Sequence, residues 1–157
     1  MQPILAGLLA TAGMSVAMRA AQALNLLDRP PPGVITERAL RLRPVAIKPR
    51  NALITTTAHF GYGASLALPF ALMQRRANLR TRAPVAGMAY GLAVYVANYE
   101  LMLPALRLMP PAHDDNAGRV VSMMAAHLVY GATLELLLRR KPERPSMTAR
   151  AAIDEHG

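Results

Sequence analysis

The chain has 157 residues, of which 53% are hydrophobic, and it carries a formal net charge of +9. It contains no cysteine, which excludes disulfide bonds, thiolate metal sites and cysteine nucleophiles. The basic residues lie between long apolar runs instead of sharing one polar face with aromatic residues, and this distribution is typical of membrane-protein loops rather than of nucleic-acid binders. We therefore expect a protein of the lipid bilayer that does not bind nucleic acid.

Four apolar segments are long enough to cross a bilayer as helices, which takes about 20 residues at about 1.5 Å each. They cover residues 4–27, 52–73, 85–106 and 120–138. The first segment follows Met1-Gln2 without a basic stretch and exceeds the length of a signal-peptide core, so we expect it to be retained. The predicted fold is an all-α bundle of four transmembrane helices in one membrane domain, residues 1–141, followed by a charged and partly disordered tail, residues 142–157.

The linker over residues 33–50 has an apolar side and a basic side. Ile35 and its apolar neighbours oppose Arg38 and several other basic residues, which is the pattern of a short helix lying on anionic lipid headgroups. Pro44 and Pro49 interrupt any long helix here, so an ordinary polar linker is the alternative.

Four spans place both termini on the same side of the membrane as the loop over residues 74–84. The loops over residues 28–51 and 107–119 then lie on the other side. Basic residues are almost equally numerous on the two sides, so the positive-inside rule separates the two orientations poorly. We place the termini in the cytoplasm because the basic residues on their side lie directly against the helix ends.

Three short motifs occur twice in the same order, which indicates an internal duplication. The pairs are Ala6-Gly7 with Ala86-Gly87, Pro30-Pro31 with Pro110-Pro111, and residues 58–64 with residues 126–132, which both contain Ala-His-x-x-Tyr-Gly-Ala. Each half holds an even number of spans, so the halves insert in the same direction and would be related by an axis along the membrane normal. We therefore predict that the bundle consists of two parallel helical-hairpin repeats.

The His-x-x-Tyr-Gly-Ala motif, which begins at His59 and again at His127, combined with the Pro-Pro loops, resembles the YagU-like group of uncharacterised bacterial inner-membrane proteins. The resemblance covers most of the apolar segments. It implies a multi-pass protein of the bacterial inner membrane, and it implies no established chemistry. The function is therefore left open by this resemblance.

Each apolar segment contains one ionisable residue at a similar depth, seven to nine residues from the charged residue that bounds the segment on the side opposite the termini. At about 1.5 Å per residue, these groups lie roughly 10 to 14 Å below that surface. Ionisable groups inside spans usually face the bundle interior. We therefore predict a polar layer of Arg19, His59, Glu100 and His127, in which Arg19 and Glu100 form an ion pair. The alternative for Arg19 is that its side chain extends to the membrane surface.

The two histidines are each followed by a tyrosine three residues later and a glycine four residues later, which brings these groups near one helical face. The supporting residues are Tyr62, Gly63, Tyr130 and Gly131. Three interpretations stay open: close helix packing with tyrosine hydroxyls bonded across it, a proton or ion site, and a pair of axial ligands to haem b or a metal. Gly87-x-x-x-Gly91 is a further predicted packing site, and Glu135 near Arg139 is expected to be an anchor at the membrane surface.

The chain contains no recognisable nucleophile with a base, phosphate-binding loop or dinucleotide fingerprint, so we do not expect an enzyme. His113-Asp114-Asp115 offers possible metal ligands, but a loop of this composition is usually solvated. The preferred function is the handling of protons, ions or solutes in the membrane. The alternatives are a bis-histidine haem b or metal protein that transfers electrons, and a non-catalytic subunit that binds another membrane protein.

Overall fold

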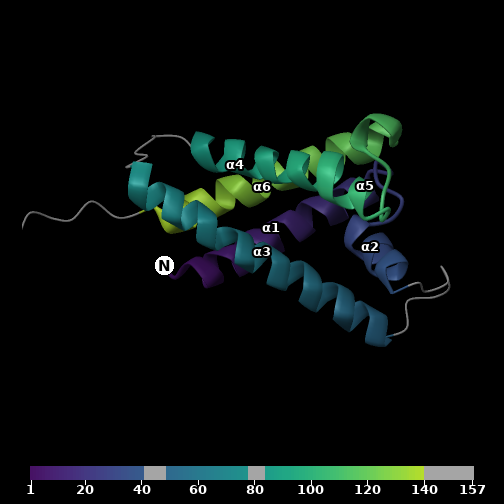
Figure 1. Ribbon diagram of the computed structural model, residues 1–157, viewed down its shortest axis with the longest axis horizontal. Helices are drawn as coiled ribbons and strands as arrows, with labels where there is room; N and C mark the ends of the chain where they lie inside the picture. The colour runs from purple at the N-terminus through teal and green to yellow at the C-terminus, as the bar shows by residue number, and fades with distance from the viewer. Residues whose placement is uncertain (41–48, 78–83, 140–157) are drawn as a thin grey trace, which may run out of the picture.

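The structure is a computed structural model that describes residues 1–40, 49–77 and 84–139 (Figure 1). The longest helices are α1 (Pro3–Ala23), α3 (Pro49–Ala77) and α6 (Ala117–Leu138). A fourth helical run joins α4 (Val85–Val96), the π-helix η1 (Ala97–Met102) and α5 (Leu103–Ala105) without a break. The short connections contain α2 (Pro31–Ala39) and the 3₁₀-helix η2 (Ala112–Asp114). The described residues include no strand, which confirms the all-α prediction. The predicted tail over residues 142–157 lies outside them.

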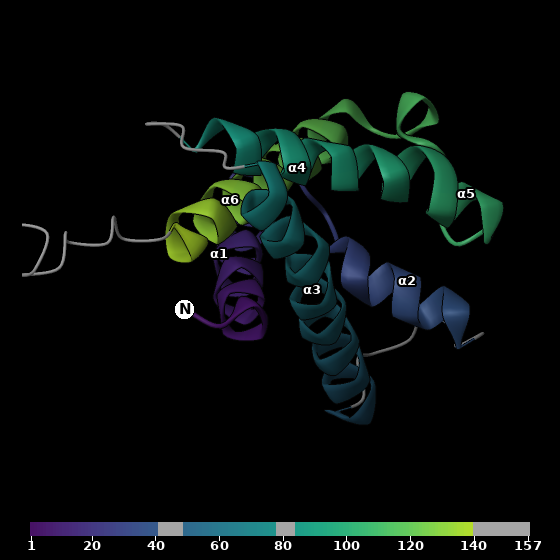
Figure 2. The ribbon, with the colours of Figure 1, turned by 60° about the vertical axis from the view of Figure 1, so that its left-hand side comes forward.

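The long helices run between two ends of the molecule, as Figures 1 and 2 show. The N-terminus, the end of α3, the start of α4 and the end of α6 lie at one end, which we call the termini end. Helices α2 and α5 lie at the opposite end, which we call the α2 end. Helix α1 packs against α3 and α6, and α4 packs against α6. Helices α3 and α4 approach each other at the termini end and diverge toward the α2 end.

Two of the described helices, α1 and α6, are long and apolar enough to cross a membrane. They contain most of the first and last predicted spans. The second predicted span lies within α3, whose N-terminal half is made more polar by three consecutive threonines, Thr55 to Thr57, and by His59. The third predicted span corresponds to the run from α4 to α5, where η1 interrupts the α-helical geometry.

Helix α1 ends at Ala23, before the predicted limit at residue 27, because the chain closes the helix with a capping turn. Asn25 adopts a left-handed conformation with a φ of 57°. Its N–H and that of Leu26 donate to carbonyls of the last helical turn over distances of 3.0 Å, which satisfies groups that a helix end leaves free. The turn after α5 has the same form, with Arg107 at a φ of 56°.

The π-helix η1 lies just before Pro104, and the proline accounts for it. Proline has no N–H, and its ring clashes with the carbonyl four residues earlier, here that of Glu100. The backbone responds with a wider turn, in which the N–H of Leu103 donates to the carbonyl of Asn98. The extra residue in this turn changes which side chains face the interior: Asn98 and Tyr99 are buried, whereas Glu100 is partly exposed.

Helices α4 and α6 cross at glycines, so their backbones are in contact. A Cβ atom at Gly131 would overlap the carbonyl oxygen of Gly87, and a Cβ atom at Gly91 would overlap the carbonyl oxygen of His127. The predicted packing role of Gly87-x-x-x-Gly91 is confirmed by these contacts. Close approach of this kind gives helices extensive van der Waals contact without large side chains.

Helices α1 and α3 cross at glycines in the corresponding positions of the first half. A Cβ atom at Gly7 would lie 2.7 Å from the Cα of Ala64 and 2.9 Å from the carbonyl oxygen of Gly63. A Cβ atom at Gly63 would overlap the hydroxyl of Thr11. Both hairpins are therefore held by the same kind of contact between a glycine and a facing backbone.

Glu135 stabilises the α4–α6 crossing and is not the surface anchor that the sequence suggested. Its side chain is only 1% exposed, and its Oε2 accepts a hydrogen bond of 2.6 Å from the N–H of Gly87. This N–H belongs to the first turn of α4, where N–H groups have no partner within the helix and a negative charge is favourable. Arg139 lies 3.7 Å from the other carboxylate oxygen.

Helix α2 is the described part of the predicted surface segment over residues 33–50, since residues 41–48 lie outside the described structure. Pro31 and Thr36 are buried against the bundle. Arg38 donates a hydrogen bond of 2.7 Å to the carbonyl of Leu108, which attaches α2 to the turn that follows α5. The helix therefore covers the α2 end of the bundle.

The glycine contact predicts a large difference between two Gly→Ala substitutions. Gly131→Ala places a methyl group against the backbone of α4 and should lower the free energy of unfolding by about 1 to 3 kcal/mol. Gly61→Ala is the matched control, because nothing lies within 4 Å of its added Cβ and alanine is the better helix former. Unfolding in detergent, followed by circular dichroism, measures both. Equal stability of the two variants would contradict the close crossing.

Candidate functional site

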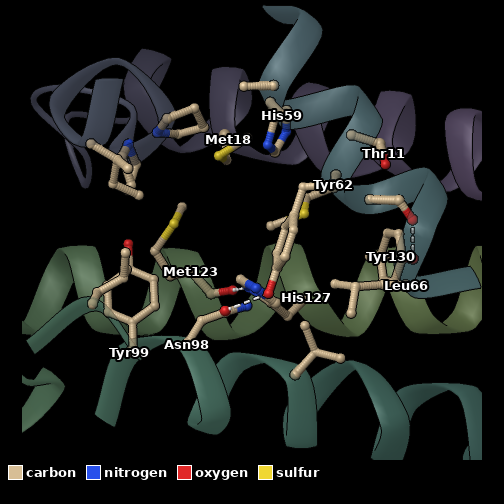
Figure 3. Close-up of a pocket in the computed structure, with 18 of the residues that line it drawn as sticks. Thr11, Met18, His59, Tyr62, Leu66, Asn98, Tyr99, Met123, His127 and Tyr130 are labelled. Carbon is tan, nitrogen blue, oxygen red and sulfur yellow. Dashed lines mark hydrogen bonds between the residues drawn. The ribbon is translucent and has the colours of Figure 1, made fainter. Parts of the chain in front are cut away.

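The described helices surround a partly open cavity of about 270 Å³, which is lined by α1, α2, α3, α4, η1, α5 and α6. Its surface is almost entirely apolar, with Met14, Met18 and Met123 among the lining residues. The polar side chains that line it are Thr11, Thr36, Thr55, His59, Tyr62, Asn98, Tyr99, His127 and Tyr130. Both predicted histidines therefore reach the same cavity, as Figure 3 shows.

His127 is buried, and its ring orientation is set by a hydrogen bond. Its Nδ1 lies 2.8 Å from the carbonyl oxygen of Met123, and because a carbonyl only accepts hydrogen bonds, Nδ1 carries the proton. The neutral ring then presents Nε2 as an acceptor. The ring edge packs against Tyr95, with 5.4 Å between the ring centroids. Helix α6 thus holds the imidazole in one tautomer and one orientation.

His59 projects from α3 on the other side of the cavity (Figure 3). Its Nε2 is buried, and it has no hydrogen-bond partner within the described part of the chain. A buried polar atom without a partner typically costs about 1 to 3 kcal/mol. His59 thus lines the cavity with a ring nitrogen that the described helices leave unpaired.

The tyrosines of the two motifs connect different helices. The Tyr130 hydroxyl donates to the carbonyl oxygen of Gly63 over 2.7 Å, which joins α6 to α3. The Tyr62 hydroxyl donates to Oδ1 of Asn98 over 2.7 Å, which joins α3 to η1. Gly63, like Gly131, lies at a helix crossing. The structure therefore gives these supporting residues packing and positioning roles around the histidines.

The predicted pair between Arg19 and Glu100 is wrong. Arg19 is exposed on α1, and Glu100 instead contacts Nδ1 of His113 at 3.2 Å. Neither Arg19 nor Glu100 lines the cavity. The position of a residue along a helix does not determine the direction of its side chain around the helix axis. The polar layer is thus reduced to its histidines.

Asn98 and Tyr99 line the cavity and were not predicted. An amide within an apolar run is a detectable signal, but the π-helix that turns both side chains inward is not. Tyr99 stacks on Tyr95 with 5.1 Å between centroids, and neither hydroxyl has a partner among the described residues. Tyr99 therefore joins His59 as a polar group that the surrounding helices leave unpaired.

A haem fits this cavity poorly. Two imidazoles on different helices suit the axial positions of a haem iron, as the sequence suggested for His59 and His127. A cavity of about 270 Å³, however, is at the lower limit of pockets for drug-sized ligands, and a porphyrin is larger than these. No group of three or more His, Asp or Glu side chains in the described residues is placed to hold a metal ion.

Comparison with known proteins adds a family and no chemistry. A family model described as a family of unknown function (DUF6789) matches residues 1–149. No curated protein and no solved structure matches the chain. The chemistry of the cavity has to be inferred from its own residues.

The positions of Arg19 and Glu100 predict additive effects of their substitution. In a double-mutant cycle of Arg19→Ala and Glu100→Ala, the coupling energy should lie within about 0.5 kcal/mol of zero, as for separated sites. The cycle of Glu100→Ala with His113→Ala is the control and should give a non-zero coupling energy, because these side chains touch. Unfolding in detergent provides all values. Strong coupling in the first cycle would show that Arg19 and Glu100 meet.

Proposed function

Because the chain belongs to the DUF6789 family, a family of unknown function, we propose its function from geometry alone: it is a four-span membrane protein that binds a small, mainly apolar solute. The cavity between the helices is the binding site, and His59 and His127 are its polar contacts. Of the functions preferred from the sequence, this proposal keeps the handling of solutes and leaves out the handling of protons or ions. The proposed location is the bacterial inner membrane.

Four spans are supported by the lengths and directions of the helices. Besides α1 and α6, the run from Val85 to Ala105 is continuous, and at about 1.5 Å per residue it is about 30 Å long, the thickness of a bilayer core. Helix α3 is longer than either α1 or α6 and carries Arg75 and Arg76 in its last turn. The helices run between the same two ends of the molecule (Figure 1).

The proposed repeat is supported by equivalent contacts in the two halves. Gly7 meets the backbone at Gly63 in the first hairpin, and Gly87 meets the backbone at Gly131 in the second. The first helical run of each half also ends with the same type of capping turn. Two copies of one hairpin account for both similarities.

The observation that carries the proposal is the unpaired Nε2 of His59 beside an apolar cavity. An ion in such a cavity would need opposite charges, and Glu100 and Arg19 do not line it. An apolar molecule with one hydrogen-bonding group matches both the walls and the histidine. The cavity therefore favours a solute of this kind over an ion.

A photoreactive ligand tests the proposal. A long-chain alcohol that carries a diazirine should label cavity residues of the protein in lipid vesicles, as mapped by mass spectrometry. Val94→Phe, in the cavity wall, should abolish this labelling because the ring occupies the cavity. Val96→Phe is the control on the same helix, because Val96 is 48% exposed and does not line the cavity.

Two results would count against the proposal. Labelling spread evenly over residues that face the lipid, with none in the cavity, would indicate that the alcohol dissolves in the bilayer only. Equal cavity labelling of Val94→Phe and Val96→Phe would show that the cavity is not the binding site. Either result would favour a structural or assembly subunit.

A further inference from the structure

We infer that the ligand of this cavity is a single-chain amphiphile of the bilayer, admitted sideways between α3 and η1 past a hydrogen bond that joins Tyr62 and Asn98. The inference rests on the proposed binding site and adds the class of ligand and its route. A single-chain amphiphile here means one apolar chain that carries one small hydrogen-bonding head.

The route follows from the way α3 and α4 are joined. Near the termini end, the Tyr90 hydroxyl donates to the carbonyl of Leu66 over 2.6 Å, and the Tyr90 ring packs on Phe70 with 4.9 Å between centroids. Beyond these contacts the two helices diverge toward the α2 end, as both ribbon views show (Figures 1 and 2). The cavity extends between these two segments, because His59 and Tyr62 line it from α3 and Asn98, Tyr99 and Met102 line it from η1.

The two segments beside this gap expose apolar side chains. Ile54 on α3 and Met102 on η1 are exposed, as are their neighbours Leu53 and Leu101. In a four-span protein these side chains lie at the level of the hydrocarbon, where an apolar rim is compatible with lipid and unfavourable in water. The gap therefore faces the bilayer.

Helix α2 covers the end of the cavity nearest the membrane surface. Pro31, Pro32 and Ile35 contribute apolar walls there. The hydroxyl of Thr36 donates to the carbonyl of Pro32 over 2.8 Å, so it offers no free donor to a water path. Access from the aqueous side is thus less favourable than access from the lipid.

The hydrogen-bond inventory of the walls limits the head group of the ligand. Thr11, Thr36, Tyr62 and Tyr130 already donate their hydroxyl protons, and His127 donates from Nδ1. Among the described lining residues, the buried polar atoms without a partner are Nε2 of His59 and Oη of Tyr99. These two atoms, together with Nε2 of His127, suit one hydroxyl, carbonyl or carboxyl group. They do not suit a sugar or a large headgroup, whose further polar atoms would be left unpaired.

Tyr62 and Asn98 close the gap reversibly. Tyr62 is 43% exposed, so its side chain has room to turn outward, and its partner Asn98 belongs to the π-helix. One neutral hydrogen bond is weak enough to break during exchange. The bond holds α3 near η1 when the ligand is inside.

The absence of tryptophan from the chain makes a direct test possible, since a single introduced tryptophan reports on its own surroundings. Met14→Trp places the reporter in the cavity wall, with Met18→Trp as a second reporter if the first variant does not fold. Val16→Trp, at a position 66% exposed on the same helix, reports on the surrounding lipid. Phe70→Trp, at a buried position that does not line the cavity, is the negative control.

In vesicles of lipids brominated on their acyl chains, Met14→Trp fluorescence should be quenched strongly, Val16→Trp likewise and Phe70→Trp weakly. Aqueous acrylamide should quench Met14→Trp little. Added dodecanol should displace the brominated chain and restore the fluorescence of Met14→Trp but not of Val16→Trp. Tyr62→Phe in the Met14→Trp background should make this recovery about fivefold faster, the factor expected for the loss of one neutral hydrogen bond.

Quenching of Met14→Trp by acrylamide and not by brominated lipid would overturn the sideways route while leaving the proposed binding site intact. Quenching by neither agent would overturn the route as well. Unchanged recovery in Tyr62→Phe would remove the role of the Tyr62–Asn98 bond. Absence of cavity labelling by the photoreactive alcohol in the protein without substitutions is the separate result that would refute the binding site itself.

Discussion

The rest of the structure depends on the contact of helix backbones at glycine. Gly87 and Gly131 let α4 and α6 touch along their crossing, and Gly7 does the same for α1 against α3. Because α1 also packs along α6, three of the four contacts between neighbouring helical runs are close. The fourth contact, between α3 and α4, is close only near the termini end. The cavity is the space that remains on that side of the bundle.

Each hairpin contains a glycine contact of this kind, but the residues around the contact differ between the two hairpins. The position equivalent to Glu135 in the second half is Ala67 in the first, which packs against Gly7 through its methyl group. A buried carboxylate bonded to Gly87 thus strengthens one crossing, whereas the other relies on van der Waals contact. Pro104 and its π-helix likewise occur only in the second half of the described chain. The π-helix turns Asn98 and Tyr99 into the cavity, so the proposed repeat contains one asymmetric site.

The chemistry of the cavity follows from which polar groups the fold has already satisfied. The threonine and tyrosine hydroxyls that bond to carbonyls strengthen the bundle and leave the walls apolar in effect. His127 is held in a single tautomer by α6. His59 has no such bond at Nε2, so a hydrogen-bonding partner would lower its free energy. A mainly apolar ligand with one polar group is the natural complement.

Composition and hydrophobic periodicity by themselves determined the helical architecture of this protein. Apolar run lengths predicted the positions of the long helices to within a few residues, since helix length is a local property, and the repeated motif predicted that His59 and His127 would share an environment. Side-chain direction was decided only by tertiary structure. Arg19 and Glu100 point away from the cavity, because rotation about a helix axis depends on which faces pack and on the π-helix before Pro104. The role of Glu135 depended on its distance from Gly87, which lies far away in sequence and becomes a neighbour only when α4 and α6 cross.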